Sequence, residues 1–484
     1  MVALAAEPAT LNPALDGSPE TAAVGCQIWN GLVVLDRHFE PRPELARGWS
    51  WSADGRRLTL SLQPGVRWHD GRPLTAADVK FTLVDVVARH NTRAAAAFAR
   101  VEGVEAADPV TVVLRLSRPY APLLQYLTCA DAPVLPRHVY GDGAVASHPR
   151  NTVQPVGTGP FRWAGRGIDR IELGRNPDYF RPGQPYLDRL EFRVIPDAAA
   201  RLRALAAREV DYVPGASLPP AGLARLRADP GVVLREGAGL PRSALLLFNT
   251  RRAPVADVRV RRALAMGLSR TRLADEAWAG LGVVSRGAVH AGLRWARSAV
   301  VDYTRRFAFD PARGRALLTE AGYPPKDEGP RLTLRLVHPA DLSAAAVLAR
   351  ESWKSIDVAV TVEAGEPRGD WDLRLALSPP GGDPDLATAP VYLSAGPQGS
   401  NPTGYANPTL DDLFTQGVEL VSRPERRKYY SHAQSLIAED LPVLALVDLL
   451  EADAVSEALR GFAASGTPWA GWDRVWRADG ARPR

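Results

Sequence analysis

The chain has 484 residues, which is too many for one ordinary hydrophobic core, so we expect two or three folding units. Hydrophobic residues make up 46% and charged residues 23%, proportions that are normal for a folded globular protein and that argue against disorder. The formal net charge is +5, but the basic residues are spread along the whole chain. Because no cluster is dense enough to follow a phosphate backbone, the sequence predicts no nucleic-acid partner.

The first six residues (MVALAA) are typical of the second half of a β-strand. They carry neither the basic start nor the full apolar core of a secretory signal. No apolar run in the sequence approaches the roughly 20 residues that cross a bilayer. We therefore expect any export signal to lie outside this sequence.

The chain has two cysteines, Cys26 and Cys129, which are too few for a disulfide framework or a four-cysteine metal site. We expect them to be buried free thiols. One bridge between them is the alternative that the sequence leaves open.

The first part of the chain combines strands, turns and a capped helix. Apolar and polar residues alternate from residue 58, and a Pro-Gly pair closes this half-buried strand. Thr75 and Asp78 have the spacing of a capping box, so a helix is expected to begin there. Residues 110–116 predict another strand.

A β-α-β unit follows. Residues 157–161 form a predicted turn into a strand, and residues 168–173 alternate again. A strand at 187–196, a helix capped by Asp197 and a strand at 210–213 then follow one another closely.

The second half is richer in helix. Asp257 and Asp310 each cap a predicted helix. A strand at 332–337, a helix near 342–355 and a strand at 358–362 form a second β-α-β unit. Units of this kind in both halves predict two α/β lobes, and ligands usually bind in the cleft between such domains.

A search for catalytic chemistry finds no nucleophile elbow, no phosphate loop and no metal-binding H-E-x-x-H helix. The eight histidines lack the i, i+4 pairing that lets two imidazoles share a metal. Residues 157–159 (GTG) lack the third glycine of a dinucleotide loop. We therefore predict no catalytic residue, no metal site, no cofactor and no enzymatic activity, with a hydrolase that uses the cleft as the alternative.

Short motifs occur in order along almost the whole chain. The longest covers residues 66–81 (VRWHDGRPLTAADVKF). Others are 43–49 (PELARGW), 157–161 (GTGPF), 175–180 (RNPDYF), 257–264 (DVRVRRAL), 317–323 (LLTEAGY) and 404–411 (GYANPTLD). Together they resemble the motifs of family 5 of the bacterial extracellular solute-binding proteins, the oligopeptide-, dipeptide- and nickel-binding type.

The resemblance implies an α/β fold of two lobes, the cluster C type of periplasmic binding protein, with an extra domain inserted in the first lobe. Two crossover segments join the lobes. For this sequence the expected first lobe is 1–33, 157–240 and 456–484. The inserted domain is then 34–156, and the second lobe is 241–455.

In the peptide-binding members that this chain resembles, the ligand lies extended between the lobes and pairs its backbone with short strands. One segment that contacts the ligand lies early in the chain, and the other lies around a D-P motif of the second lobe. The ligand-binding residues expected from the resemblance are Asp16, Gly17, Ser18, Arg374, Gly381, Gly382 and Asp383.

The second segment departs from the pattern of the peptide binders. Those proteins carry a tryptophan and then an aspartate shortly before the D-P proline, and the aspartate faces the α-ammonium of the peptide. Here Leu377 or Ser378 stands at the tryptophan position, and Pro380 or Gly381 at the aspartate position. The usual ammonium clamp is therefore not expected in this chain. Arg374 is either suited to a ligand carboxylate or a solvent-facing strand residue.

The resemblance implies the substrate-binding protein of an ABC importer, a monomer that delivers its solute to the permease subunits in the membrane. A peptide is the first expectation for the solute, with a metal chelate, an opine or a sugar as alternatives. The expected location is periplasmic, or extracytoplasmic with a membrane anchor. The other reading, a ligand-sensing domain of a cytoplasmic regulator, would need an added helix-turn-helix that these residues do not supply.

Overall fold

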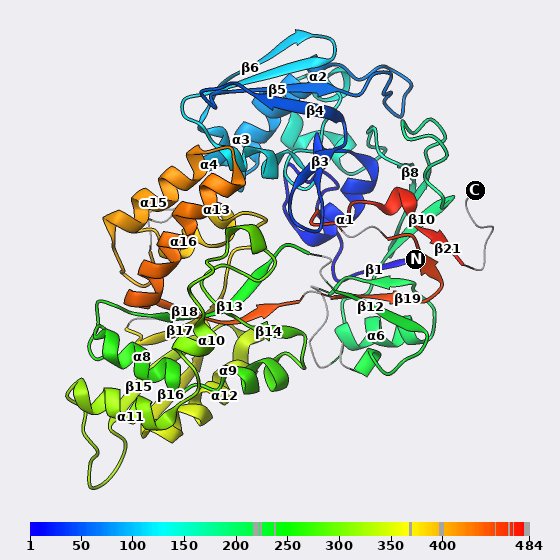
Figure 1. Cartoon of the computed structure of the whole chain (residues 1–484). Helices are drawn as coiled ribbons and strands as arrows, with labels where there is room; N and C mark the ends of the chain where they lie inside the picture. The colour runs from blue at the N-terminus through cyan, green and yellow to red at the C-terminus, as the bar shows by residue number, and fades with distance from the viewer. Residues whose placement is uncertain are drawn as a thin grey trace. The chain divides into compact units, whose positions relative to one another are not determined.

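A computed structural model describes residues 1–215, 222, 225–236, 239–366, 370–395, 401–450, 452–462, 465–467 and 469–478. The chain divides into two compact units (Figure 1). Unit 1 comprises Met1–Leu240 and Glu451–Arg484, and unit 2 comprises Pro241–Leu450. The boundaries expected for the lobes and for the inserted domain stay a prediction.

The larger sheet of unit 1 has the strand order β12-β19-β11-β1-β10-β9-β8. Its strands are β1 (Val2–Leu4), β8 (Phe161–Arg166), β9 (Arg170–Arg175), β10 (Arg189–Val194), β11 (Tyr212–Val213), β12 (Val232–Glu236) and β19 (Ala452–Ser456). The N-terminal β1 lies in the centre, parallel to both β10 and β11. Helix α6 (Ala198–Ala206) connects β10 to β11 and is capped by Asp197, so the first predicted β-α-β unit is confirmed.

A second sheet of unit 1 has the antiparallel order β4-β5-β7-β6. Its strands are β4 (Ala46–Trp51), β5 (Arg57–Leu62), β6 (Val101–Asp108) and β7 (Thr111–Leu116). The alternation that predicted β5 buries Leu58, Leu60 and Leu62 on one face. The predicted capping box opens α2 (Ala76–Phe81), with the backbone N–H of Thr75 donating to Asp78 Oδ2 at 2.9 Å.

Unit 1 also contains shorter elements. They are β2 (Val33–Leu35), β3 (Pro41–Pro43), α3 (Ala88–His90), α4 (Ala95–Phe98), α5 (Arg137–Tyr140), β20 (Leu459–Arg460) and β21 (Trp476–Arg477). Between α2 and α3 the chain forms a π-helical turn over Thr82–Val87, which the sequence pattern did not predict.

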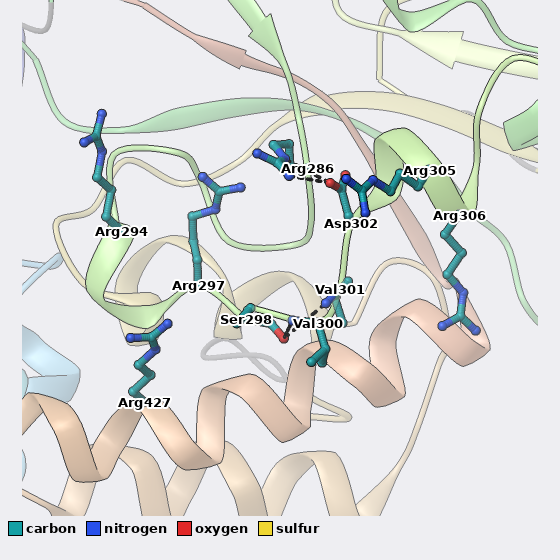
Figure 2. A pocket seen from close by; sticks show the side chains of 11 residues that line it. Arg286, Arg294, Arg297, Ser298, Val300, Val301, Asp302, Arg305, Arg306 and Arg427 are labelled. Carbon is teal, nitrogen blue, oxygen red and sulfur yellow. Dashed lines mark hydrogen bonds and ion pairs between the residues drawn. The ribbon is translucent and has the colours of Figure 1, made fainter.

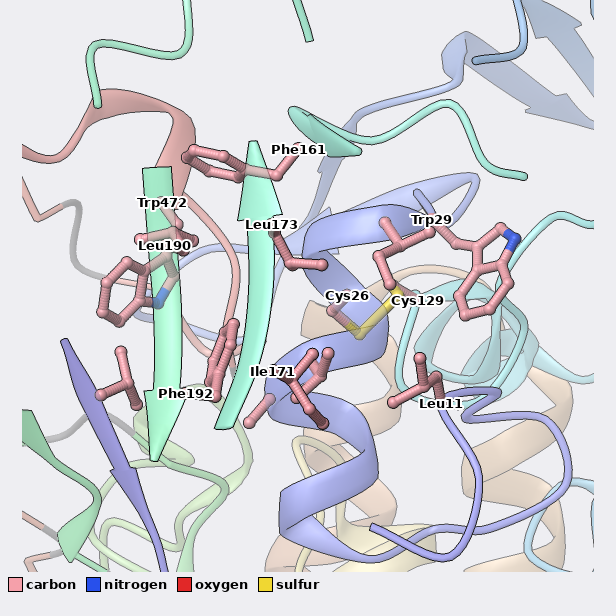
Figure 3. Close-up of a cluster of buried hydrophobic side chains, with 14 of the residues drawn as sticks. Leu11, Cys26, Trp29, Cys129, Phe161, Ile171, Leu173, Leu190, Phe192 and Trp472 are labelled. Atoms are coloured by element: carbon pink, nitrogen blue, oxygen red, sulfur yellow. A yellow bond between two sulfur atoms is a disulfide. The ribbon is translucent and has the colours of Figure 1, made fainter. Parts of the chain in front are cut away.

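The hydrophobic core of unit 1 packs helix α1 (Pro19–Ile28) against the larger sheet and against the segment around residue 129 (Figure 3). Cys26 of α1 and Cys129 form a disulfide within this core, with a Cα–Cα distance of 5.7 Å. Our expectation of two free thiols is therefore wrong. The cysteines are separated by 103 positions in the sequence, and no local pattern reports a contact at that separation.

The sheet of unit 2 has the order β14-β18-β13-β17-β15-β16. Its strands are β13 (Arg242–Phe248), β14 (Gly282–Val284), β15 (Leu332–His338), β16 (Val358–Ala364), β17 (Leu373–Leu377) and β18 (Val443–Leu449). Strands β15 and β16 are parallel and are connected through α12 (Ser343–Trp353), which confirms the second predicted β-α-β unit.

The longer helices of unit 2 begin where the sequence places their caps. Asp257 and Asp310 accept the backbone N–H groups of Arg259 and Arg313 at 2.8 and 2.9 Å. The helices of unit 2 besides α12 are α8 (Val258–Met266), α9 (Arg270–Arg272), α10 (Tyr303–Arg306), α11 (Pro311–Glu320), α13 (Pro384–Ala387), α14 (Ala389–Tyr392), α15 (Pro408–Glu419) and α16 (Arg423–Asp440). None of the helices in the described parts of the chain combines the length and the apolar surface that a bilayer crossing requires.

Candidate functional site

The first candidate segment is the turn that leads into α1. The carboxylate of Asp16 accepts hydrogen bonds from the backbone N–H and Oγ of Ser18, at 3.0 and 2.7 Å, and from Oγ1 of Thr21 at 2.6 Å. Burial opposes ionisation of Asp16, but the hydrogen bonds from Thr21 and Ser18 outweigh it and hold the pKa of this carboxyl below its ordinary value. The turn therefore keeps a fixed negative charge at its surface.

Ser18 and Gly17 have different positions in this turn. Ser18 Oγ accepts the backbone N–H of Thr21 at 3.2 Å and so caps α1. Gly17 is exposed, and a Cβ added to it would meet no atom within 4 Å. Asp16, Gly17 and Ser18 thus lie together in one turn, with the backbone at Gly17 exposed to solvent.

Arg374 lies on β17 in unit 2. Its guanidinium donates to Glu366 Oε2 at 2.9 Å, and the side chain of Glu366 is 80% exposed. An ion pair with so exposed a partner contributes only about 0–1 kcal/mol. A ligand carboxylate could therefore replace Glu366 at little energetic cost.

Asp383 is buried in the interior of unit 2. It caps α13, and its two carboxylate oxygens accept Nη1 and Nη2 of Arg426 on α16 at 2.8 and 2.7 Å. The two side chains are 2% and 4% exposed. Burial alone would lower the pKa of Arg426, but Asp383 outweighs it and raises that pKa. The carboxylate thus anchors the loop before α13 to α16.

Two glycines precede Asp383 in the same loop, and both are buried. A Cβ on Gly381 would lie 2.4 Å from Leu386 Cβ and 3.1 Å from the backbone nitrogen of Ala387. Only glycine allows the loop to pack this closely on α13. The predicted residues of the second segment, from Gly381 and Gly382 to Asp383, therefore form one tightly packed turn.

The sequence interpretation missed a buried polar cluster in unit 1. It lines a cavity of about 210 Å³ together with Trp469 and Trp472. Arg181 pairs with Asp473 at 2.7 Å, and Glu44 accepts Asn30 Nδ2 at 2.9 Å. Burial raises the pKa of Glu44 to about 7.

The residues of this buried polar cluster are far apart in the chain, so no spacing in the sequence could have grouped them. Glu44 does fall within the family-like segment 43–49, which was the available signal. Among the described residues, no group of three or more His, Cys, Asp or Glu side chains could hold a metal ion.

The model of the bacterial extracellular solute-binding proteins, family 5 Middle, matches residues 40–402 of the chain. The chain belongs to this family. Among curated relatives, the dipeptide-binding protein of Escherichia coli K12 is 27% identical over 94% of this chain and 90% of its own length. The heme-binding protein A of Haemophilus influenzae is 27% identical over 91% and 85%. The glutathione-binding protein GsiB of Escherichia coli K12 is 26% identical over 96% and 91%.

Solved structures agree on the fold of this family 5 protein. HbpA2 of Haemophilus parasuis has a TM-score of 0.84 at 23% identity, covering 98% of this chain and 99% of its own. CtaP of Listeria monocytogenes has a TM-score of 0.84 at 22% identity, covering 99% of each chain. The predicted fold class, a two-lobed α/β periplasmic binding protein, is therefore confirmed. As a member of family 5, the chain is a solute-binding protein of the extracellular class, and the family is not one of enzymes.

Proposed function

We propose that this family 5 protein captures a peptide in the cleft between its lobes and delivers it to the membrane subunits of an ABC importer. The observation that carries the proposal is the similarity to the dipeptide-binding protein of Escherichia coli, which extends over 94% of this chain. The proposed lobes keep the boundaries expected from the sequence, with the first lobe at 1–33, 157–240 and 456–484, the inserted domain at 34–156 and the second lobe at 241–455.

Two charged side chains would face the ends of such a peptide. Asp16 supports recognition of an ammonium group, because its carboxylate is ionised at neutral pH and the hydrogen bonds from Thr21 and Ser18 hold its pKa below the ordinary value. Arg374 supports recognition of a carboxylate, because its present partner is an exposed glutamate. The backbone around Gly17 and Ser18 and the turn of Gly381 and Gly382 would supply hydrogen bonds to the peptide backbone.

Asp383 has a different role in this proposal. Its carboxylate is already neutralised by Arg426, so it would shape the binding loop and not face the α-ammonium. The chain thus offers no aspartate for the α-ammonium near its D-P motif. This is consistent with a solute that is recognised more through its carboxylate than through its amino group.

The test begins with native mass spectrometry of the freshly purified protein, which would reveal a retained solute. Peptide pools are then added in a thermal-shift assay, where a ligand at 100 times its Kd contributes about 2.7 kcal/mol. We expect short peptides to raise the Tm, and Arg374→Gln to abolish the response to peptides with a free carboxylate. Glu366→Gln is the matched control and should keep the response.

Failure of all peptides, with a Tm rise for an opine, a sugar or a metal chelate, would overturn the peptide assignment and leave the import role. A response that Arg374→Gln does not alter would exclude this arginine from the site.

We further propose that the protein acts outside the cytoplasm as a monomer, with no cofactor or nucleic-acid partner and without turning over its solute. The disulfide between Cys26 and Cys129 supports this location, because such bonds persist in oxidising compartments. Incubation with a bound peptide followed by mass spectrometry tests the last point: the peptide should be recovered intact, and cleaved products would indicate a hydrolase.

A further inference from the structure

A depression of about 840 Å³ in unit 2 is lined by an unusual number of arginines (Figure 2). They come from three stretches of the chain, which are the residues just after β14, the continuous stretch 294–306 that ends with α10, and α16. We call this site the arginine depression and define it by Arg286, Arg294, Arg297, Arg305, Arg306 and Arg427. One carboxylate, that of Asp302, also lines it.

The charge of the arginine depression is out of proportion to that of the chain. Six arginines and one aspartate leave five excess positive charges, which equals the formal net charge of +5 for all 484 residues. The remaining residues therefore sum to a formal net charge of zero. Like charges on neighbouring elements repel each other, so the site favours a negatively charged partner.

Few of these guanidinium groups are neutralised by the protein. Arg286 forms an ion pair with Asp302, as Figure 2 shows. Within the described ranges, Arg294, Arg297, Arg305 and Arg427 have no ion pair with any carboxylate. The buried Arg426, by contrast, forms an ion pair with Asp383.

The shape and chemistry of the site argue against a small enclosed anion. The depression is open to solvent, and Arg294, Arg305, Arg306 and Arg427 are exposed. Backbone N–H groups often complete phosphate sites, but two of those at the rim are already used. The N–H groups of residues 300 and 301 both donate to Ser298 Oγ at 3.3 Å.

One exposed apolar side chain lies among the arginines of this depression. Val300 is 82% exposed, and Figure 2 shows it between the loop that carries Arg297 and the helix that carries Arg427. The basic surface continues along α16, where Lys428 and His432 line a neighbouring hollow together with Arg427. Spread cationic side chains around a protruding apolar residue are typical of proteins that lie on anionic membranes.

We propose that the arginine depression docks the protein on a surface of anionic phospholipid headgroups. The guanidinium groups contact the phosphates, and Val300 enters the interface between headgroups and acyl chains. The proposal rests on the import function, because a solute-binding protein held at the membrane lies close to its permease. Electrostatic attraction of this kind reaches about one Debye length, roughly 10 Å at 0.1 M salt.

The experiment uses the full chain with vesicles of phosphatidylcholine alone or with about one third phosphatidylglycerol. Cosedimentation should show about tenfold or more binding to the anionic vesicles, with loss of binding near 1 M salt, where the Debye length is about 3 Å. A triple variant, Arg294→Gln with Arg297→Gln and Arg427→Gln, should lose about tenfold or more of this binding. Val300→Ser should weaken it by a smaller factor.

The matched control removes the same charge from unit 1. Arg47, Arg56 and Arg72 are exposed and form no ion pair within the described chain, which makes them comparable to the three arginines of the triple variant. Their replacement by Gln removes three positive charges and so gives the same net charge as the triple variant. The control should bind anionic vesicles like the wild type. Circular dichroism melting verifies that both variants fold, and the thermal-shift assay with peptides verifies that both still bind solute, which separates this proposal from the import function.

Three results would overturn the proposal. Both triple variants could bind vesicles equally, which would make the attraction a property of net charge alone. Neutral vesicles could bind as strongly as anionic ones. Finally, inorganic pyrophosphate could raise the Tm of the wild type but not of the arginine-depression variant, with no vesicle binding by either protein, which would identify a site for a soluble anion.

Discussion

At the scale of single residues, Glu44 makes the stability of unit 1 depend on pH. Burial raises the pKa of Glu44 to about 7, whereas an unfolded glutamate titrates near 4.5. Between these two pH values the folded chain holds a proton that the unfolded chain has released. The free energy of unfolding therefore falls as pH rises from about 4.5 to 7.

Glu44→Gln removes this titration and keeps a side-chain oxygen to accept from Asn30. His69, whose pKa burial lowers to about 4, acts in the opposite direction between about 4 and 6.5. The measurement is therefore the difference in urea unfolding free energy between variant and wild type at each pH. We expect the variant to gain relative stability of up to about 3 kcal/mol between pH 5 and 7.5, with one pKa unit corresponding to about 1.4 kcal/mol. A constant difference across this range would show that Glu44 does not titrate there.

At the scale of elements, the pair of Asp383 and Arg426 joins α13 to α16. Asp383→Asn leaves a buried guanidinium without its counter-charge, and breaking such a pair costs about 3–5 kcal/mol. Glu366→Gln breaks an exposed pair with Arg374 and should cost less than about 1 kcal/mol. Urea unfolding followed by circular dichroism compares the two variants directly. Equal losses would mean that burial of the Asp383 pair contributes nothing to the difference.

The sequence predicts the ends of helices well but does not predict which distant elements lie in contact. Asp197, Asp257 and Asp310 cap their helices as expected, because a cap depends on residues three or fewer positions away. Contacts between distant segments leave no such signal. Only the fold brings Glu44 and Asp473 to one cavity, and only the fold brings Arg427 of α16 to the arginines of residues 286–306. The expected site residues were found through the family resemblance, and their contacts with a ligand stay predictions.

At the scale of the whole molecule, the disulfide closes a loop of 103 residues in unit 1 and leaves unit 2 untouched. Cross-linking restricts the unfolded chain, and a loop of this length corresponds to roughly 4–5 kcal/mol in the chain-entropy model. Its ends lie in α1 and in the segment before Ala132, both of which pack into the core shown in Figure 3. Removal of the bond should therefore destabilise one unit and not the other.

The double variant Cys26→Ala with Cys129→Ala tests this division by hydrogen exchange and mass spectrometry. We expect peptides from α1 and from residues 121–132 to exchange about tenfold or more faster, because roughly 2–5 kcal/mol of stabilisation is lost. Peptides from β13 and β18 in the sheet of unit 2 should exchange as in the wild type. The wild type in a reducing agent should reproduce the variant, which separates the effect of the bond from that of the lost sulfur atoms. Faster exchange throughout both units would mean that the two units unfold as one and that the disulfide stabilises the chain as a whole.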